Sequence, residues 1–177
     1  MDPAFSEVLD RCRAGERDAF EQVIARYGLQ VLRTVRLIVR DEELAEDVCR
    51  EAFVKAWRSL RTLGKEEPGP WLTRIATNES ISACRRRHRF DPLAQRGGLV
   101  GIPRQAISTE TTRDVGRALE GLSPEQRAAV VLHYYQGLSV EETARALSAP
   151  VDTMKSRMKA ALQRLRELTG IEEVANE

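Results

Sequence analysis

The chain has 177 residues, of which 42% are hydrophobic, 31% are charged and only 5% are aromatic. Its 28 Lys and Arg residues nearly balance its 27 Asp and Glu residues, which leaves a formal net charge of +1. This composition excludes a disordered charged tail, a collagen-like chain and a disulfide scaffold. The longest apolar run, 128–132, is far shorter than the roughly 18 residues of a membrane span, so we expect no membrane insertion.

The cysteines and the first residues of the chain bear on its cellular compartment. Cys12, Cys49 and Cys84 are an odd number and lack the C-x-x-C spacing of a redox or zinc motif. The N-terminal residues lack the basic and apolar segments of a secretory signal. We therefore expect a reduced, cytoplasmic protein whose cysteines pack as small hydrophobic side chains.

Hydrophobic residues recur at the helical period through the first half of the chain. The pattern predicts helices over about 5–12, 18–39, 41–60 and 71–89. Between the last two, Gly64 and the Pro-Gly-Pro sequence at 68–70 predict a loop over 61–70. The acidic run at 41–43 supplies the negative charge that the start of a helix favours.

Residues 91–113 interrupt this periodicity with glycines and prolines and develop no apolar face, which is typical of a linker. The helical period returns from residue 114 onward. The sequence therefore predicts an all-α fold of two small helical domains, 1–90 and 114–177, joined by a flexible linker over 91–113.

Start and stop signals divide the second domain into short helices. Two pairs of residues have the spacing of a capping box, namely Ser123 with Gln126 and Ser139 with Glu142. The first of these helices is expected to bury Tyr135 on its apolar face. A shorter helix over 139–147 precedes a turn at Pro150, and a last helix is expected from about Asp152.

A short helix, a tight turn and a longer amphipathic helix follow one another in the order of a helix-turn-helix. In that motif the second helix enters the major groove of duplex DNA, and its N-terminal residues reach the base edges. The polar and basic residues in this position are Thr153, Lys155, Ser156, Arg157 and Lys159. We predict duplex DNA binding here, with a helical bundle that exposes a solvated basic face as the alternative.

A second basic segment lies along the helix expected at 71–89. It combines an aromatic ring, an amide and a run of cations in Trp71, Arg74, Asn78, Arg85, Arg86, Arg87 and Arg89. Aromatic stacking and cations along the phosphates hold single-stranded nucleic acid. The alternatives are that Trp71 anchors the core and that the arginines complement the C-terminal end of the helix dipole.

The sequence contains no arrangement that predicts catalysis or metal binding. His88 lies in the arginine run and His133 in a helical core pattern, so the two histidines have no joint role. No His, Cys or carboxylate cluster has the spacing of metal ligands, and no Gly-rich phosphate loop follows a strand. We expect a protein that is not an enzyme and has no cofactor or metal.

Several motifs, in order and in register, give a more specific resemblance. They are Asp18-Ala19-Phe20, 45–48 with 51–53 and Ala56-Trp57, 71–78, 122–127, 138–144 and 151–161. With these motifs the chain resembles the extracytoplasmic-function (ECF) subfamily of bacterial sigma-70-type sigma factors, the promoter-specificity subunits of RNA polymerase. The similarity covers nearly the whole chain, including the irregular linker.

The resemblance implies that the chain binds core RNA polymerase and directs initiation at promoters with −10 and −35 elements. The residues that match the polymerase-docking helix are Asp47, Glu51, Phe53 and Trp57. The domain core is the alternative place for Phe53 and Trp57, and it is the one we expect for Trp57. Those that match the region trapping the melted −10 strand are Trp71, Arg74, Asn78, Arg85 and Arg86. The helix that reads the −35 duplex matches Thr153, Lys155, Ser156, Arg157 and Lys159. An anti-sigma protein is a further partner that the resemblance implies.

Four positions depart from the family pattern. Arg50 stands where the family usually has Gln, and Ser82 where it has an acidic residue. Asp152, in place of a common Gly, is expected to be able to cap the last helix, and Ala160 stands where Arg is frequent.

Two other functions are compatible with parts of the sequence. One is a helix-turn-helix regulator that binds duplex operator DNA independently of polymerase, which leaves the basic helix at 71–89 unexplained. The other is an interaction protein that only sequesters a partner and has no affinity for DNA.

Overall fold

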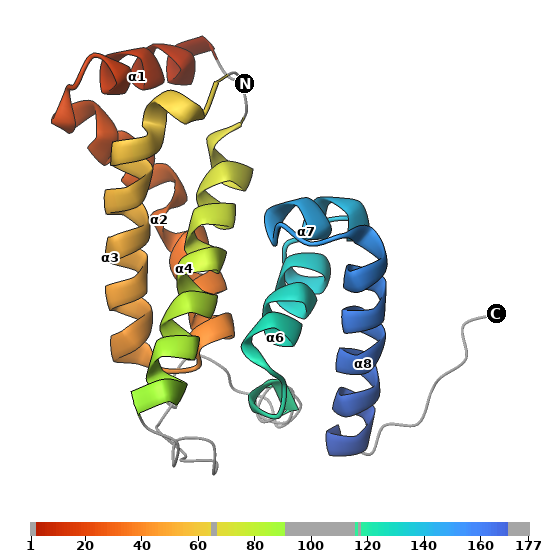
Figure 1. Cartoon of the computed structure of the whole chain (residues 1–177). Coiled ribbons are helices and arrows are strands. Elements are labelled where there is room, and N and C mark those ends of the chain that lie inside the picture. The colour runs from red at the N-terminus through yellow and green to blue at the C-terminus, as the bar shows by residue number, and fades with distance from the viewer. Residues whose placement is uncertain (1–2, 65–66, 91–115, 117, 170–177) are drawn as a thin grey trace. The chain divides into compact units, whose positions relative to one another are not determined.

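The computed structural model describes residues 3–64, 67–90, 116 and 118–169 (Figure 1). Every regular element within these residues is a helix, which confirms the all-α fold class. The chain divides into two compact units, 1–83 and 84–177, and helix α4 continues across this boundary to Phe90. The expected linker, 91–113, lies outside the described residues.

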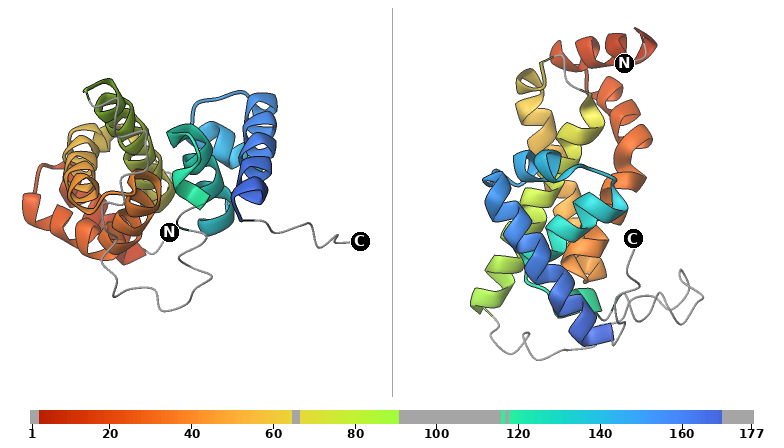
Figure 2. Two further views of the ribbon diagram at one scale, coloured as in Figure 1. Left: turned by 90° about the horizontal axis from the view of Figure 1, so that it is seen from below. Right: turned by 90° about the vertical axis from the view of Figure 1, so that its right-hand side faces the viewer.

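The first unit is a bundle of long helices. In chain order they are α1 (Pro3–Arg13), α2 (Arg17–Val39), α3 (Glu42–Ser59), the single 3-10 turn η1 (Leu60–Thr62) and α4 (Pro68–Phe90). Helices α2 and α3 form a hairpin, and α1 packs against α2. Helices α2, α3 and α4 run alongside one another, whereas α1 lies across one end of them (Figure 1, Figure 2).

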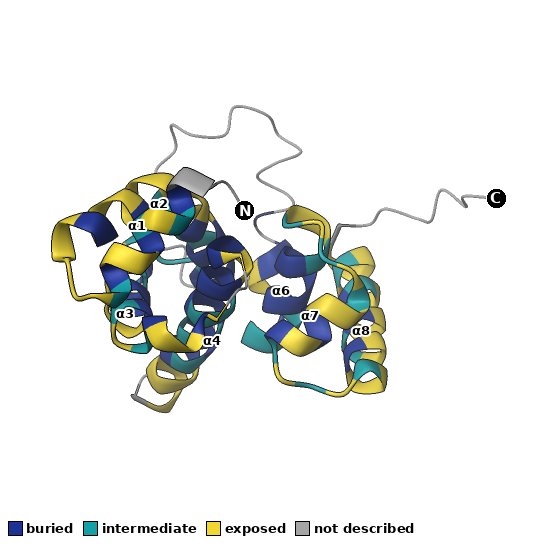
Figure 3. Ribbon diagram, turned by 90° about the horizontal axis from the view of Figure 1, so that it is seen from above, coloured by how far each residue is buried: buried dark blue, intermediate teal, exposed yellow. Residues whose placement is uncertain are grey.

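The core of the bundle follows from the apolar face of each helix. Along α1 to α4, the ribbon is coloured as buried mostly where it faces the other helices and as exposed on the outer side (Figure 3). Three of the buried residues of α3 are alanines, Ala45, Ala52 and Ala56, which allow the backbones of neighbouring helices to approach closely. The hydrophobic burial that stabilises the bundle therefore comes from the same stripes that the sequence predicts.

The α2–α3 turn is short because both helix ends have local caps. Arg40 adopts a left-handed conformation with φ 61° and closes α2 through a hydrogen bond from its N–H to the Arg36 carbonyl. Asp41 then caps α3, since its carboxylate accepts a hydrogen bond from the Leu44 N–H at 2.8 Å. The acidic run at 41–43 thus begins a helix, as its position predicts.

The prediction of a loop over 61–70 is wrong for residues 68–70. Pro68, Gly69 and Pro70 form the first turn of α4. Prolines fit there because the first N–H groups of a helix have no intrahelical acceptor. Gly69 allows α4 to approach α2 closely, since a Cβ atom at this position would lie 3.1 Å from Cε1 of Tyr27.

The second unit contains the shorter helices. They are α6 (Pro124–Val130), the π-helical turn η3 (Val131–Tyr135), α7 (Val140–Ala146) and α8 (Val151–Thr169). Both capping boxes are confirmed, because each serine accepts from the third helical N–H and each Gln or Glu side chain accepts from the serine N–H. Helix α8 packs against both α6 and α7.

The π-helical turn explains why one residue that was expected in the core is exposed. Its wider turn is closed by the Gln136 N–H, which donates to the Val131 carbonyl five residues earlier at 3.1 Å. The insertion shifts the helical phase, so that Tyr135, expected in the core, is 50% exposed beside Tyr134, which is 59% exposed. His133 instead contacts the Leu138 carbonyl through Nδ1 at 2.6 Å.

Two buried threonines of the first unit give a test of the packing. Thr77 and Thr34 are both fully buried, but Oγ1 of Thr77 has no hydrogen-bond partner among the described residues, whereas Oγ1 of Thr34 donates to the Gln30 carbonyl at 2.9 Å. Thr77→Val should raise the free energy of unfolding by about 1 kcal/mol, because it removes an unsatisfied hydroxyl at constant shape. Thr34→Val should bring no such gain. Urea unfolding measures both, and a destabilising Thr77→Val would contradict this description.

Candidate functional site

The first candidate surface is the outward face of α3. Asp47, Glu51 and Val54 are exposed and follow one another at spacings of four and three residues, which places them on one face of the helix. We refer to these three residues as the docking stripe. Val54, which is 42% exposed, adds an apolar side chain beside the two carboxylates.

Phe53, expected on this surface, lies in the core instead. It is only 8% exposed, and its ring meets Phe20 of α2 edge-on at 6.4 Å between centroids. Trp57 packs on the same Phe20 ring at 5.2 Å and is partly buried, in line with its expected place. Val54 is thus the exposed apolar residue on this face of α3.

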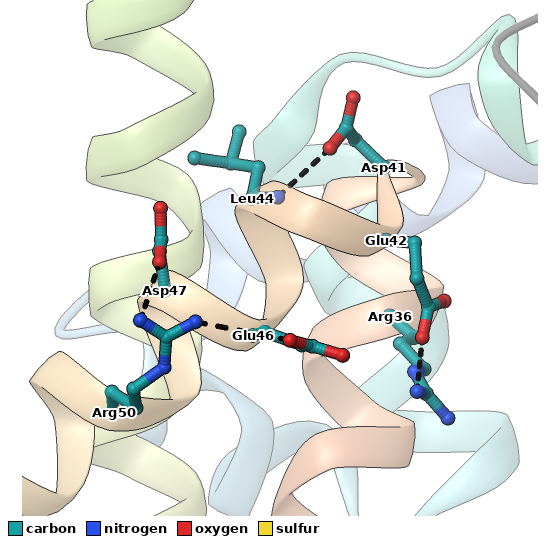
Figure 4. A network of polar contacts seen from close by, with 7 residues as sticks. All are labelled: Arg36, Asp41, Glu42, Leu44, Glu46, Asp47 and Arg50. Carbon is teal, nitrogen blue, oxygen red and sulfur yellow. Dashed lines mark hydrogen bonds and ion pairs between the residues drawn. The ribbon is translucent and has the colours of Figure 1, made fainter.

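Ion pairs form at the start of α3 and along its acidic face. Arg36 of α2 pairs with Glu42 and holds the helix start against its neighbour (Figure 4). Further along α3, the Arg50 guanidinium lies between two carboxylates, 2.9 Å from that of Asp47 and 3.7 Å from that of Glu46. The two acids of the docking stripe therefore differ, because Glu51 forms no ion pair with any described residue.

The second candidate surface lies along α4. Arg74 and Asn78 are partly exposed at a spacing of four residues, and Arg85 to Arg89 are exposed near the helix end. Trp71 is only 3% exposed, so it anchors the core and its ring does not offer a stacking face. Of the two interpretations of Trp71, the structure supports the core anchor. The predicted contact residue Arg85 is already paired, because its guanidinium lies 2.6 Å from Oε1 of Glu125.

One ion pair ties this surface to the rest of the bundle. Nζ of Lys55 on α3 lies 2.7 Å from Oε1 of Glu79 on α4, and the Glu79 side chain is only 13% exposed. Because Glu79 directly follows Asn78, the pair fixes the α4 backbone at the residue expected to bind an unstacked base. The ion pair thus connects the α3 surface to α4 beside Asn78.

The third candidate surface is the helix-turn-helix of α7 and α8. Its turn is tight, with Ser148 at φ 49° and the Ala149 N–H donating to the Ala144 carbonyl at 2.9 Å. Met154 and Met158 of α8 are buried beneath it. Asp152, expected as a possible cap, instead lies inside the first turn of α8, where its carbonyl accepts from the Ser156 hydroxyl at 3.0 Å.

The face of α8 away from this core is polar and basic. Thr153, Lys155, Ser156 and Lys159 are exposed, and Arg157 is partly exposed. The cations Lys155, Arg157 and Lys159 form no ion pair with another residue in the described ranges. Their charge is therefore available to a polyanion such as a DNA backbone.

The described residues hold no group of three or more His, Cys, Asp or Glu side chains that could bind a metal ion. The cysteines pack as expected at Cys12 and Cys84, which are buried, and Cys49 is partly buried. Burial raises the pKa of the Cys12 and Cys49 thiols, so both resist ionisation to the reactive thiolate. In the part of the chain that is described, no helix combines the length and hydrophobicity needed to span a bilayer.

Comparison with known proteins places these surfaces in a family context. Residues 23–90 match the family model for sigma-70 region 2, and residues 112–165 match that for sigma-70 region 4. The chain is 36% identical over 166 residues to the ECF RNA polymerase sigma factor SigM of Mycobacterium tuberculosis, covering 93% of this chain and 84% of that protein. It is 32% identical over 170 residues to the RNA polymerase sigma factor CarQ of Myxococcus xanthus, covering 92% and 95%.

A solved structure supports the same relationship. The sigma factor RpoE, crystallised with the anti-sigma factor NepR from Bartonella quintana, superposes with a TM-score of 0.70 at 26% sequence identity. The match covers 87% of this chain and 98% of that one.

Proposed function

Because the chain belongs to the ECF family of RNA polymerase sigma factors, we propose how its three surfaces divide the work of promoter recognition. The docking stripe of α3 binds core RNA polymerase, the outer face of α4 holds the melted −10 strand, and α8 reads the −35 duplex. The protein acts by binding and not by catalysing a reaction. It works in the cytoplasm, where polymerase and chromosome are found.

The proposed domains follow the same division. Residues 1–90 carry the polymerase and −10 contacts, 114–177 carry the −35 contact, and 91–113 link them. The region 2 and region 4 matches at 23–90 and 112–165 support these bounds. Two separate contacts with DNA suit a protein whose spacing on the promoter is set by the polymerase.

The single observation that carries this proposal is the coexistence of an acidic and a basic surface in one chain. The exposed carboxylates of α3 suit a basic protein partner, because complementary charge orients and accelerates association. The cations Lys155, Arg157 and Lys159 of α8, which have no ion-pair partner among the described residues, suit DNA. A regulator that binds only duplex DNA has no use for the acidic stripe, and a protein that only sequesters a partner has no use for the basic helix.

Transcription in vitro tests the proposal against these two alternatives. Purified chain and sigma-free core enzyme are incubated with a pool of randomised promoters, and the transcripts are sequenced. We expect start sites that share a −10 and a −35 element and that require the chain. Transcription that does not depend on the chain, or DNA binding that is the same without core enzyme, would refute the proposal.

Asn78→Ala tests the assignment of the −10 contact. Loss of the amide should reduce open-complex formation by about tenfold, because a base held outside the stack loses its hydrogen-bonding partner. Binding to core polymerase and dependence on the −35 element should not change. Heparin-resistant complexes on a premelted and a duplex promoter measure the effect, and an unchanged yield on both would remove Asn78 from the site.

An anti-sigma protein is the further partner that we propose. The structural relative RpoE was crystallised with an anti-sigma factor, NepR. Such a partner would compete with core polymerase for exposed surface of the chain. Its addition to the transcription assay should therefore lower the yield in proportion to its concentration, and extra core enzyme should restore it.

A further inference from the structure

Arg50 is the one basic residue within an otherwise acidic segment of the α3 surface, Glu46 to Glu51. It follows Glu46 by four residues and Asp47 by three, and its guanidinium lies between their two carboxylates (Figure 4). All three side chains are largely exposed, at 70% for Arg50, 59% for Asp47 and 54% for Glu46. An acid followed four residues later by a base is the favourable orientation on a helix.

An exposed ion pair of this kind contributes little to stability, because water and salt screen both charges and two long side chains lose freedom. The structure therefore gives Arg50 no strong role in holding the fold together. Arg50 instead changes the charge that α3 offers to a partner, because it pairs with the carboxylate of Asp47 and leaves that of Glu51 without an ion pair among the described residues.

We propose that Arg50 limits the affinity of the docking stripe for core polymerase by competing with the basic partner surface for Asp47. The inference rests on the proposed function of α3. A cation of the partner must compete with the Arg50 guanidinium for the Asp47 carboxylate, so part of the negative charge at Asp47 is already neutralised when the partner approaches. Arg50 therefore sets how strongly this chain competes for polymerase.

The asymmetry between the two acids gives the sharpest consequence. With Arg50 in place, Glu51→Gln should weaken polymerase binding more than Asp47→Asn does, because only Glu51 offers an unshared charge. After Arg50→Gln, Asp47 is released, and the two substitutions should then weaken binding to a similar extent.

The experiment is a fluorescence titration of the full-length chain with core RNA polymerase at low and high salt. Arg50→Gln should lower the Kd roughly two- to fivefold at low salt, which is the range for one exposed pair, and by less at high salt. The gain should vanish in Asp47→Asn combined with Arg50→Gln. Arg17→Gln is the control, because Arg17 is exposed at the opposite end of α2 from the α2–α3 turn and its replacement changes the net charge equally.

The outcomes separate the inference from the proposed function. If Arg50→Gln leaves the Kd unchanged or raises it, or if the gain persists without Asp47, the role assigned to Arg50 is wrong. The docking proposal still stands in that case, provided that reversing the charges of Asp47 and Glu51 abolishes binding. If that reversal leaves binding intact, both fall.

Discussion

Replacing Asp47 and Glu51 together by arginine should abolish stable binding to core RNA polymerase. Both carboxylates are exposed on one face of α3, so the change converts the docking stripe from acidic to basic without touching the core. Opposing like charges at an interface cost several kcal/mol, and we expect the Kd to rise by at least about 100-fold. Native gel shift or surface plasmon resonance with immobilised core enzyme measures the loss.

A matched control separates this local effect from net charge. Glu7 and Glu21 are exposed on α1 and α2 and lie outside the docking stripe, and their replacement by arginine alters the net charge by the same amount. That variant should bind polymerase nearly as well as the unaltered chain. If both double variants bind equally, α3 is not the docking helix.

Reversing the charge of Lys155 and Lys159 should remove the contribution of the −35 element. Both lysines are exposed near the start of α8 and have no ion-pair partner among the described residues, so their charge is free for DNA. With Lys155→Glu and Lys159→Glu, we expect initiation from a promoter with a −35 element to fall by about 100-fold. The salt dependence of promoter binding should lose roughly two units of slope, one for each lost phosphate contact.

The same charge reversal further along α8 serves as the comparison. Arg164 and Arg166 lie in the last turns of this helix, beyond the N-terminal residues that reach base edges in a helix-turn-helix. Their replacement by glutamate should weaken binding to a much smaller extent. Equal losses in the two variants would mean that α8 attracts DNA by charge alone and does not read the −35 sequence.

The helices were predictable because burial imposes a period that local signals then delimit. The stripes of α2 and α3, both capping boxes and the turn before α8 follow directly from residue spacing. The start of α4 and the phase of Tyr135 were not predictable in this way. Pro68–Pro70 is read equally as a loop or as a first helical turn, and a π-helical turn has no clear sequence signature.

The functional surfaces were only partly predictable, and the errors have a common cause. Phe53 belongs to the apolar stripe of α3, whose period already places it inside, whereas Val54 is apolar and falls outside that stripe. The position of Val54 outside the apolar stripe of α3 was therefore the sequence signal for the proposed docking contact. The ion pair of Arg50 was not predictable, because several acids lie within its reach and only side-chain geometry selects Asp47.

Footprinting of promoter DNA, with and without core enzyme, is the most direct test, with permanganate to detect unpaired thymines and DNase I to detect protected duplex. We expect unpaired thymines at the −10 element and protection at the −35 element only when the chain and the core enzyme are both present. A footprint of intact duplex that is the same with and without core enzyme would contradict it.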